Sequence, residues 1–340
     1  MECSSGWHAQ LVALGARFDE EGLVGDFGDP VAEARAMRDA AIVAPLTGLG
    51  LISVSGDDAS SFLNAQLTSD VGAVSAARAQ YSGYCTPKGR LLATSLLYAD
   101  SEAHRLLLPG ELVEPVTARL RKYVLRAKAK LEVASAAFEV FGVTGARAAE
   151  AVAGGLDEVP TPQQDFDVRH GDGKTVILLP GGRYLVICIA DQAVSTWQNL
   201  SGCALPAGSR WWELQTIRSG IATIGAATQE MFTPQMIALD ACGGVSFEKG
   251  CYPGQEIVAR TRYLGEVKRR LYYGHSMQSV AAGAVITGDE DKTLGTVVNA
   301  ARADGHAWEF LAVLQRDVVD AKLALRVRDG GAVTIERAIV

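Results

Sequence analysis

The feature that most constrains the fold is a change in the character of the sequence after Arg262. Beyond it, short runs rich in β-forming residues recur about every ten residues, with Gly and Asp between them. The runs cover residues 271–276, 284–287, 294–300, 308–314, 323–328 and 332–336. Because this spacing is typical of a small closed antiparallel barrel or sandwich, we expect an all-β C-terminal domain over residues 261–340.

The residues before Arg262 alternate between helical and β-type patterns, which predicts α+β units. A chain of 340 residues exceeds what one hydrophobic core usually supports, so we expect two or three domains. The segment 158–173 is rich in Pro, Asp and Gln and predicts a long loop. Helices are expected over 31–41, 62–67, 112–124, 146–152, 190–200 and 208–219, and strands over 51–54, 79–85, 90–98, 103–108, 129–134, 138–143, 175–179 and 183–189.

The formal charge of −7 argues against a protein coated with nucleic-acid-binding surface, because neutralising phosphates requires a net basic face. Two local clusters of basic residues remain, one between Arg119 and Lys130 and the other between Arg260 and Arg270. Each is open to two interpretations, the solvated face of a helix or strand and an anion-binding rim. We expect no direct nucleic-acid partner.

The six cysteines are scattered and include no C-x-x-C pair. Their spacing therefore offers no zinc or iron–sulfur ligand set and no disulfide framework, and we predict no stably bound metal. The N-terminus lacks the basic region and apolar stretch of a signal peptide, and no apolar run approaches the ~20 residues of a membrane span. These features predict a cytoplasmic protein without a membrane partner.

Several common catalytic patterns do not occur in the sequence. They include the P-loop motif G-x-x-x-x-G-K-[ST], the metalloprotease pattern H-E-x-x-H and the hydrolase elbow G-x-S-x-G. Gly48-Leu49-Gly50 is not followed by a third glycine at the dinucleotide-binding spacing. The sequence thus has no pattern that favours a hydrolase or a metal enzyme.

The segment from Lys249 to Glu256, KGCYPGQE, carries the most distinctive chemistry. Pro253 is suited to the first position of a helix, and the glycines on either side of it permit close approach of another backbone group. Cys251 would then lie just ahead of a helix N-terminus and two residues from Lys249, and both neighbours favour the reactive thiolate. The alternative is that Cys251 is a small apolar residue that fills a tight turn.

The longer run KGCYPGQEIVAR, residues 249–260, resembles the fingerprint of the YgfZ-type folate-binding family, which is related to the glycine-cleavage T-protein, an aminomethyltransferase. Four further blocks resemble this family in the same order along the chain, at residues 62–71, 86–91, 122–126 and 232–235. The resemblance spans about residues 38–330 and leaves residues 1–30 as an uncovered N-terminal extension.

The resemblance implies an α+β fold, a three-domain ring like that of the T-protein, with two ferredoxin-like α+β domains and a C-terminal β-barrel. It implies a discontinuous domain of residues 31–56 and 138–260, interrupted by an inserted domain of residues 57–137. The domains are expected to surround a central hole of the size of a folate.

The resemblance also implies a function. We expect binding of tetrahydrofolate or a one-carbon derivative, and an accessory role in iron–sulfur cluster assembly or repair that affects tRNA modification indirectly. Partners would be iron–sulfur client or assembly proteins. The alternative is a folate-dependent one-carbon transferase, but the stretch comparable to the one that carries the T-protein's catalytic aspartate, Gly89 to Thr94, has no carboxylate. We therefore do not expect a working aminomethyltransferase.

The expected site residues are those that the resemblance implies. Cys251 and Lys249 are the chemically active pair, and Trp212 falls where the family places a tryptophan against the folate, although a core-facing role is equally open. At Arg218 relatives carry a glutamate that pairs with pterin amino groups, and an arginine cannot accept those hydrogen bonds. Leu49 replaces a second tryptophan. The expected folate-binding residues are Trp212, Gly250, Tyr252, Gly254, Gln255, Glu256, Arg260, Arg218 and Lys88.

Overall fold

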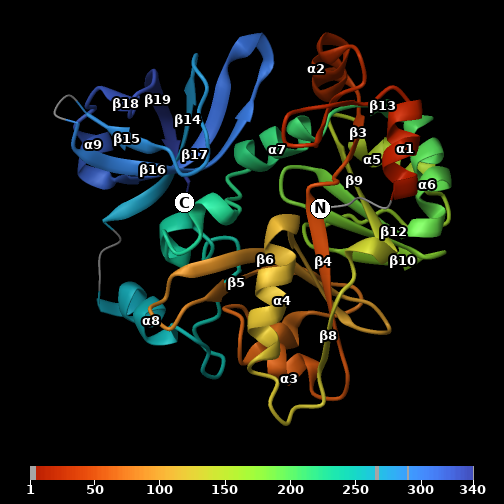
Figure 1. The fold of residues 1–340 in the computed structure, drawn as a ribbon, viewed down its shortest axis with the longest axis horizontal. Coiled ribbons are helices and arrows are strands. Elements are labelled where there is room, and N and C mark those ends of the chain that lie inside the picture. The colour runs from red at the N-terminus through yellow and green to blue at the C-terminus, as the bar shows by residue number, and fades with distance from the viewer. Residues whose placement is uncertain (1–4, 265–267, 289–290, 340) are drawn as a thin grey trace.

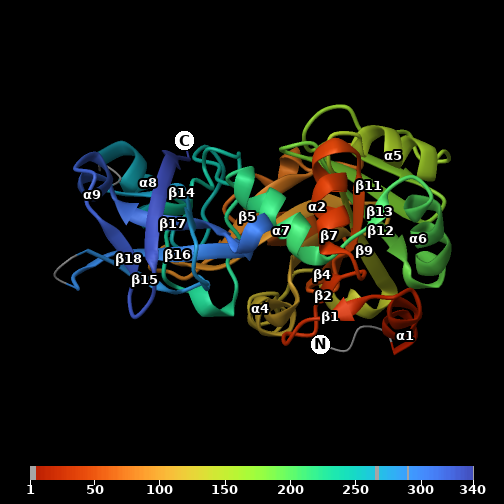
Figure 2. The same ribbon diagram turned by 90° about the horizontal axis from the view of Figure 1, so that it is seen from above.

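The computed structural model describes residues 5–264, 268–288 and 291–339. Two α+β units and a closed β-barrel surround the centre of the molecule, and helix α7 (Ser209–Arg218) lies between the barrel and the first unit (Figure 1). Seen from above, the barrel and the first unit lie at opposite ends of the long axis (Figure 2). The expected fold class, α+β with a C-terminal barrel, is confirmed.

The first unit is built on a six-stranded sheet whose strand order is β10-β11-β12-β9-β3-β13. Strand β3 precedes the second unit in the chain and β9 follows it, so the first unit is discontinuous in sequence. Its strands are β3 (Ile42–Pro45), β9 (Phe138–Thr144), β10 (Val168–Gly171), β11 (Lys174–Leu179), β12 (Arg183–Ile189) and β13 (Leu205–Pro206). Its helices are α2 (Pro30–Asp39), α5 (Ala148–Gly155), α6 (Ala193–Ser201) and α7.

The second unit is a five-stranded sheet of order β5-β6-β7-β4-β8 with two short helices. Its elements are β4 (Leu49–Ser55), α3 (Ala59–Asn64), β5 (Gln80–Cys85), β6 (Leu91–Ala99), β7 (His104–Pro109), α4 (Val113–Arg121) and β8 (Lys130–Val133). Strand β4 pairs with β7 and β8, so it belongs to this sheet and not to the discontinuous unit, where the division at residue 56 places it. A single strand's sequence does not reveal its pairing partners, and this explains the shifted boundary.

The C-terminal barrel closes in the order β14-β17-β16-β15-β18-β19. The strands are β14 (Arg269–Ser276), β15 (Val285–Thr287), β16 (Thr293–Arg302), β17 (Trp308–Gln315), β18 (Leu325–Val327) and β19 (Ala332–Ala338), and helix α9 (Arg316–Asp320) follows β17. Each of the six β-type runs in the sequence coincides with one of these strands. The regular spacing of turn residues was a sufficient signal because short strands separated by turns are typical of a small antiparallel barrel.

The N-terminal segment is part of the first unit. It forms α1 (Ser5–Ala13), β1 (Arg17–Phe18) and β2 (Val24–Asp26). Trp7 is buried, with its ring edge-on to Phe141 and Trp197. The hydroxyl of Ser209 donates a hydrogen bond to the carbonyl oxygen of Val24 at 3.1 Å. These contacts join the segment to the core of the unit and to α7.

The prediction of a loop over residues 158–173 is wrong at the C-terminal end of this range, where β10 pairs with β11 as a hairpin. Asp172 and Gly173 form the turn, both with positive φ, +46° and +70°. An Asp-Gly pair between two strands is a strong hairpin signal, so the sequence did contain the information.

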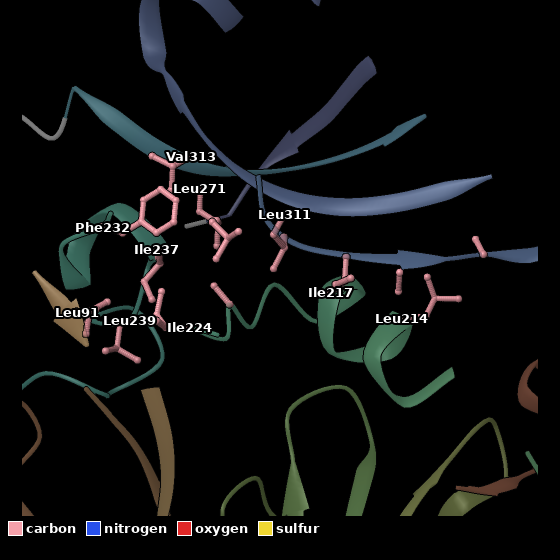
Figure 3. Close-up of a cluster of buried hydrophobic side chains, with 14 of the residues drawn as sticks. Leu91, Leu214, Ile217, Ile224, Phe232, Ile237, Leu239, Leu271, Leu311 and Val313 are labelled. Atoms are coloured by element: carbon pink, nitrogen blue, oxygen red, sulfur yellow. The ribbon is translucent and has the colours of Figure 1, made fainter. Parts of the chain in front are cut away.

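A hydrophobic cluster joins the units (Figure 3). Leu214 and Ile217 of α7 pack with Leu311 and Val313 of β17, and Leu91 of β6 belongs to the same cluster. All five side chains are buried. Since a continuous core of this kind crosses from unit to unit, their arrangement around the centre is fixed by packing. Among the described residues, no helix has the length and apolar character needed to span a membrane.

Candidate functional site

A cavity of about 1150 Å³ lies where the three parts of the molecule meet. Strands β4, β6 and β7 of the second unit, α7 and β12 of the first, and β16 of the barrel all contribute to its wall. Small-molecule sites typically have volumes of about 300–1000 Å³ and occur preferentially at such junctions. The cavity is therefore the leading candidate for a ligand site.

Helix α7 presents one face to this cavity. Ser209, Trp212, Glu213, Thr216 and Ile217 line it, and their spacing of three and four residues is that of one helical face. The N-terminal turn of α7 is fixed from the other side, where the carboxylate of Glu33 accepts hydrogen bonds from the indole of Trp211 and the backbone N–H of Gly208. The lining face is thus held rigidly.

Trp212 lies in the cavity wall and is largely covered by protein, with 7% of its surface exposed. The indole packs against the backbone of β9 at Gly142, where an added Cβ would lie 2.3 Å from a ring carbon. The guanidinium of Arg183 lies 5.1 Å from the ring centroid. The ring therefore belongs to a packed cluster, as the core-facing interpretation expects, and its accessible part faces the cavity.

Arg183 stands beside Trp212 as a buried cation of the cavity wall. Its Nε donates to the carbonyl oxygen of Pro180 at 2.9 Å and its Nη1 donates to the hydroxyl of Thr216 at 2.7 Å. Its Nη2 is buried without a hydrogen-bond partner among the described residues. An unsatisfied donor of this kind is costly unless a ligand or water completes it.

Glu213 is the neighbouring anion. Its side chain lines the cavity and is accessible from it, and the exposed Glu21 and Asp19 of the N-terminal segment lie nearby. Burial within the surrounding protein, aided by the nearby charges of Glu21 and Asp19, raises the pKa of Glu213 to about 7. No hydrogen bond or ion pair to this carboxylate is present in the described part of the chain. A carboxylate with a raised pKa in a cleft is a recognised mark of a functional site.

Thr94 of β6 also lines the cavity and ends the stretch that was compared with the T-protein's aspartate segment. Its hydroxyl accepts a hydrogen bond from the backbone N–H of Ile224 at 3.0 Å. Leu49 lines the cavity too, at the position where some relatives are expected to carry a tryptophan.

The segment containing Cys251 forms a separate exposed loop, which we call the cysteine loop (residues 246–254). Helix α8 (Gln255–Leu264) follows it. The expectation that Pro253 occupies the first helical position is wrong, because Gly254 adopts a left-handed conformation with φ of +84° and delays the helix to Gln255. The thiol of Cys251 is exposed four residues before the helix begins.

Gly254 packs against the turn between β5 and β6. A Cβ at Gly254 would lie 2.6 Å from the carbonyl oxygen of Thr86 and 2.7 Å from Cα of Gly89, so only glycine fits. Gly89 has a positive φ as well, +69°, and its own Cβ would lie 3.3 Å from the carbonyl oxygen of Gly254. The two glycine-containing motifs therefore support one another in space. Neither motif alone reveals this contact.

Lys249 holds the cysteine loop to the second unit. Its ammonium group donates hydrogen bonds to the backbone carbonyl oxygens of Asn64, of Leu67 at 2.7 Å and of Ser69 at 2.9 Å. Burial lowers the pKa of Lys249 to about 8, and the charge of Asp70 opposes the shift, so most molecules carry the charge at pH 7. In the part of the chain that the structure describes, no hydrogen bond joins Lys249 to Cys251.

The other predicted residues of this region have varied surroundings. Tyr252 is buried, its hydroxyl has no partner among the described residues, and burial raises its pKa. The amide of Gln255 donates to the carbonyl oxygen of Lys249 at 3.4 Å. Gly250, Glu256, Arg260 and Lys88 are exposed.

Arg218 connects α7 to the barrel. Its guanidinium donates two hydrogen bonds to the carboxylate of Glu309, at 2.6 and 2.8 Å, and this partner raises the pKa of Arg218. The hydroxyl of Tyr273 donates to the same carboxylate at 2.6 Å. Two nitrogens of the guanidinium are thus held in an interdomain ion pair.

The structure therefore divides the predicted site residues. Trp212 lines the cavity, and the others are not among the described residues that do so. Arg183 and Glu213 were not predicted, although Glu213 is adjacent to Trp212 and Arg183 directly follows the Gly-Gly turn before β12. No group of three or more metal-ligating side chains occurs in the described ranges.

Comparison with curated proteins identifies relatives of nearly the same length. A protein of Edwardsiella ictaluri named "tRNA-modifying protein YgfZ" is 35% identical over 285 residues, which are 82% of this chain and 85% of the relative. A protein of the same name from Yersinia pestis (strain Pestoides F) is 32% identical over 291 residues, 84% of this chain and 87% of the relative. The chain belongs to the YgfZ family.

Two further comparisons agree with membership of the YgfZ family. The family model of the GCVT N-terminal domain matches residues 15–177. Among solved structures, the glycine cleavage system aminomethyltransferase T of Bartonella henselae superposes with a TM-score of 0.80 at 16% identity, covering 97% of this chain and 95% of that one. The match confirms the T-protein-like fold, and it includes the N-terminal segment that the sequence motifs left uncovered.

Proposed function

We propose that this YgfZ-family protein binds tetrahydrofolate or a one-carbon derivative and serves as an accessory factor in iron–sulfur cluster assembly or repair. Through cluster-dependent enzymes it would affect tRNA modification, the process named for its relatives. The observation that carries the proposal is the cavity at the junction of all three parts, with an aromatic side chain and a buried cation in its wall. Such a mixture of apolar surface and a few fixed polar groups suits a conjugated heterocycle.

The orientation of the folate follows from the charges of the wall. Glu21, Glu111 and Glu213 line the cavity together with one buried cation, Arg183. An anionic glutamate tail is repelled by three carboxylates, so we expect the pterin end inside and the tail at the mouth. The clusters Arg119–Lys130 and Arg260–Arg270 contribute no lining residue among those described, and any contact with the tail would be at the surface and screened by salt.

Cys251 is the proposed point of contact with the client. Its thiol is exposed on a loop that is fixed at both ends, by Lys249 on one side and Gly254 on the other. A rigid loop that presents a thiol to solvent is suited to thiol exchange or to transient contact with a cluster held by another protein.

Replacement of Cys251 by serine tests this part of the proposal. We expect Cys251→Ser to fold normally, because the side chain is exposed, and to fail to restore a cluster-dependent tRNA-modifying enzyme in a strain that lacks this protein. Cys203→Ser is the matched control, since Cys203 is also exposed but lies two residues after α6 in the first unit. Full restoration by Cys251→Ser would remove the thiol from the mechanism.

Folate binding is tested separately by anaerobic calorimetric titration with tetrahydrofolate and its polyglutamylated forms. We expect binding by the wild type and by Cys251→Ser with equal affinity, because the thiol is not part of the cavity wall. The absence of any heat of binding with all of these ligands would contradict the folate proposal.

The one-carbon transferase has less support. Thr94 lines the cavity where the compared stretch enters it, and its hydroxyl, which accepts a hydrogen bond from the N–H of Ile224, supplies no carboxylic acid there. Ammonia-dependent formation of methylene-tetrahydrofolate from an aminomethylated carrier protein, above background, would favour the transferase.

A further inference from the structure

The cavity wall contains a carboxylate that the protein's own contacts leave unused. Glu213 follows Trp212 on α7, lines the cavity and has no hydrogen-bond or ion-pair partner in the described ranges. By contrast, Glu111 also lines the cavity, and its Oε1 accepts a hydrogen bond from the backbone N–H of Ala226 at 2.7 Å. Glu111 therefore joins two segments of the protein through this hydrogen bond, whereas Glu213 is available to a ligand.

A second unused group stands on the same wall. The Nη2 of Arg183 is buried and without a partner, and the guanidinium is fixed to α7 through Thr216, one helical turn after Glu213. Arg183 is 1% exposed. The wall thus offers an acceptor group in Glu213 and a donor group in Arg183, whose guanidinium also interacts with the hydroxyl of Tyr81 on the opposite unit.

We propose that Glu213 accepts hydrogen bonds from the ring N–H and exocyclic amino group of the pterin, and that Arg183 donates to the adjacent ring carbonyl oxygen. This inference rests on the proposed folate function and assigns the residues that recognise the ring. It places the carboxylate five residues before Arg218, whose position the family resemblance associates with this role.

The position of Arg218 explains why the carboxylate must come from elsewhere. Arg218 is held by Glu309 in the interdomain ion pair and is not among the described residues that line the cavity. Glu213 lies on the lining face of the same helix. A carboxylate has two acceptor oxygens, so it matches two adjacent N–H donors on the edge of one ring.

The same edge chemistry, two adjacent N–H donors beside a carbonyl oxygen, occurs in guanine. Pterin and guanine are therefore the two sources of a matching ring, and the test must separate them. The useful probes are 6-methyltetrahydropterin, which has the edge without the tail, p-aminobenzoylglutamate, which has the tail without the edge, and guanosine. Each is titrated into the full-length protein together with tetrahydrofolate.

The decisive variant is Glu213→Gln, which keeps the shape of the side chain and replaces one acceptor oxygen with a donor. We expect the dissociation constants of tetrahydrofolate and 6-methyltetrahydropterin to rise about 10- to 100-fold, the usual worth of hydrogen bonds to a charged group. The affinity for p-aminobenzoylglutamate is expected to stay within about twofold. Glu114→Gln is the matched control and is expected to retain wild-type affinity, because Glu114 is exposed on α4 and is not among the lining residues.

The pH dependence gives a second readout. The groups that face Glu213 are Glu21 and Asp19 of the N-terminal segment, and Arg183, Glu111 and His8 line the same cavity. The ionised form accepts hydrogen bonds best, so affinity for 6-methyltetrahydropterin should rise between pH 6 and pH 8, with a midpoint near the pKa of about 7. Glu213→Gln should lose this rise and Glu114→Gln should keep it.

The outcomes separate this inference from the function on which it rests. No binding of tetrahydrofolate by the wild type would overturn both. Wild-type binding with unchanged affinity and an unchanged pH profile in Glu213→Gln would overturn the role of Glu213 and leave folate binding intact. Tighter binding of guanosine than of the pterin probes would overturn the assignment of the ring.

Discussion

The central cavity and the cysteine loop make a useful comparison, because opposite ends of the same β5–β6 hairpin support them. Thr94 to Leu96 of β6 line the cavity, while the turn at Gly89 packs against Gly254 of the loop. In the cavity, Glu213 and Arg183 have unused hydrogen-bonding capacity. In the loop, the ammonium of Lys249 is fully engaged by the backbone. The side chains of the cavity that have hydrogen-bonding groups without partners are available to a ligand. The ammonium group of Lys249, in contrast, is paired with the backbone, and it holds the loop that exposes the thiol of Cys251.

The largest effect that would sharpen this comparison is expected from Gly254→Ala. An alanine here combines a φ of +84° with a 2.6 Å approach to the carbonyl oxygen of Thr86. We expect the free energy of unfolding, measured in urea, to fall by about 3 kcal/mol. Gly243→Ala is the control, since its φ of +77° is similar but an added Cβ meets nothing within 4 Å, and it should lose about 1 kcal/mol. Equal losses would show that the contact with the hairpin turn contributes nothing.

A somewhat smaller loss is expected from Lys249→Met. The change leaves three backbone carbonyl groups without their donor, and we expect the free energy of unfolding to fall by about 2 kcal/mol. Affinity for tetrahydrofolate should be unchanged, because Lys249 does not belong to the cavity lining. The exposed Lys122→Met should alter neither quantity. A stable Lys249→Met protein that has lost folate affinity would break the distinction between the two regions.

The smallest expected effect is a gain in stability, and it is expected for Glu213→Gln. Because the pKa of Glu213 is raised to about 7, the folded state holds this proton more tightly than the unfolded state. Its stabilising contribution is complete below the unfolded value of about 4.5 and is lost as the pH rises through 7. Glu213→Gln should therefore be more stable than the wild type at pH 8, by less than about 1.5 kcal/mol because solvent in the cavity screens the charge. Thermal melting at pH 5 and pH 8 measures this, and a less stable variant at pH 8 would mean that the carboxylate already has a partner.

The sequence predicted the parts of the fold that depend on local patterns. The barrel strands, the helices at 193–201 and 209–218 and the glycine-bounded cysteine motif were all visible from periodicity or from the residue types. The pairing of β4 and the incorporation of residues 5–26 were not, because they depend on contacts between distant segments.

The candidate site divides in the same way. Cys251 was selected because its motif is distinctive and Trp212 because of the family resemblance, whereas the meeting of Gly89 with Gly254 depends on folding. Glu213 could not be selected, because a glutamate that faces an internal cavity and one that faces bulk solvent occupy the same positions on a helical face. Arg218 was expected near the folate, and its engagement by Glu309, 91 residues away in the chain, could not be read from its own helix.

The most direct test of the account is a crystal structure of the full-length protein grown anaerobically with tetrahydrofolate. The account predicts density for the pterin ring in the central cavity, with its amino edge on Glu213, its carbonyl oxygen toward Arg183 and its tail at the mouth. Density for the ligand at the cysteine loop, with an empty cavity beside Trp212, would contradict it.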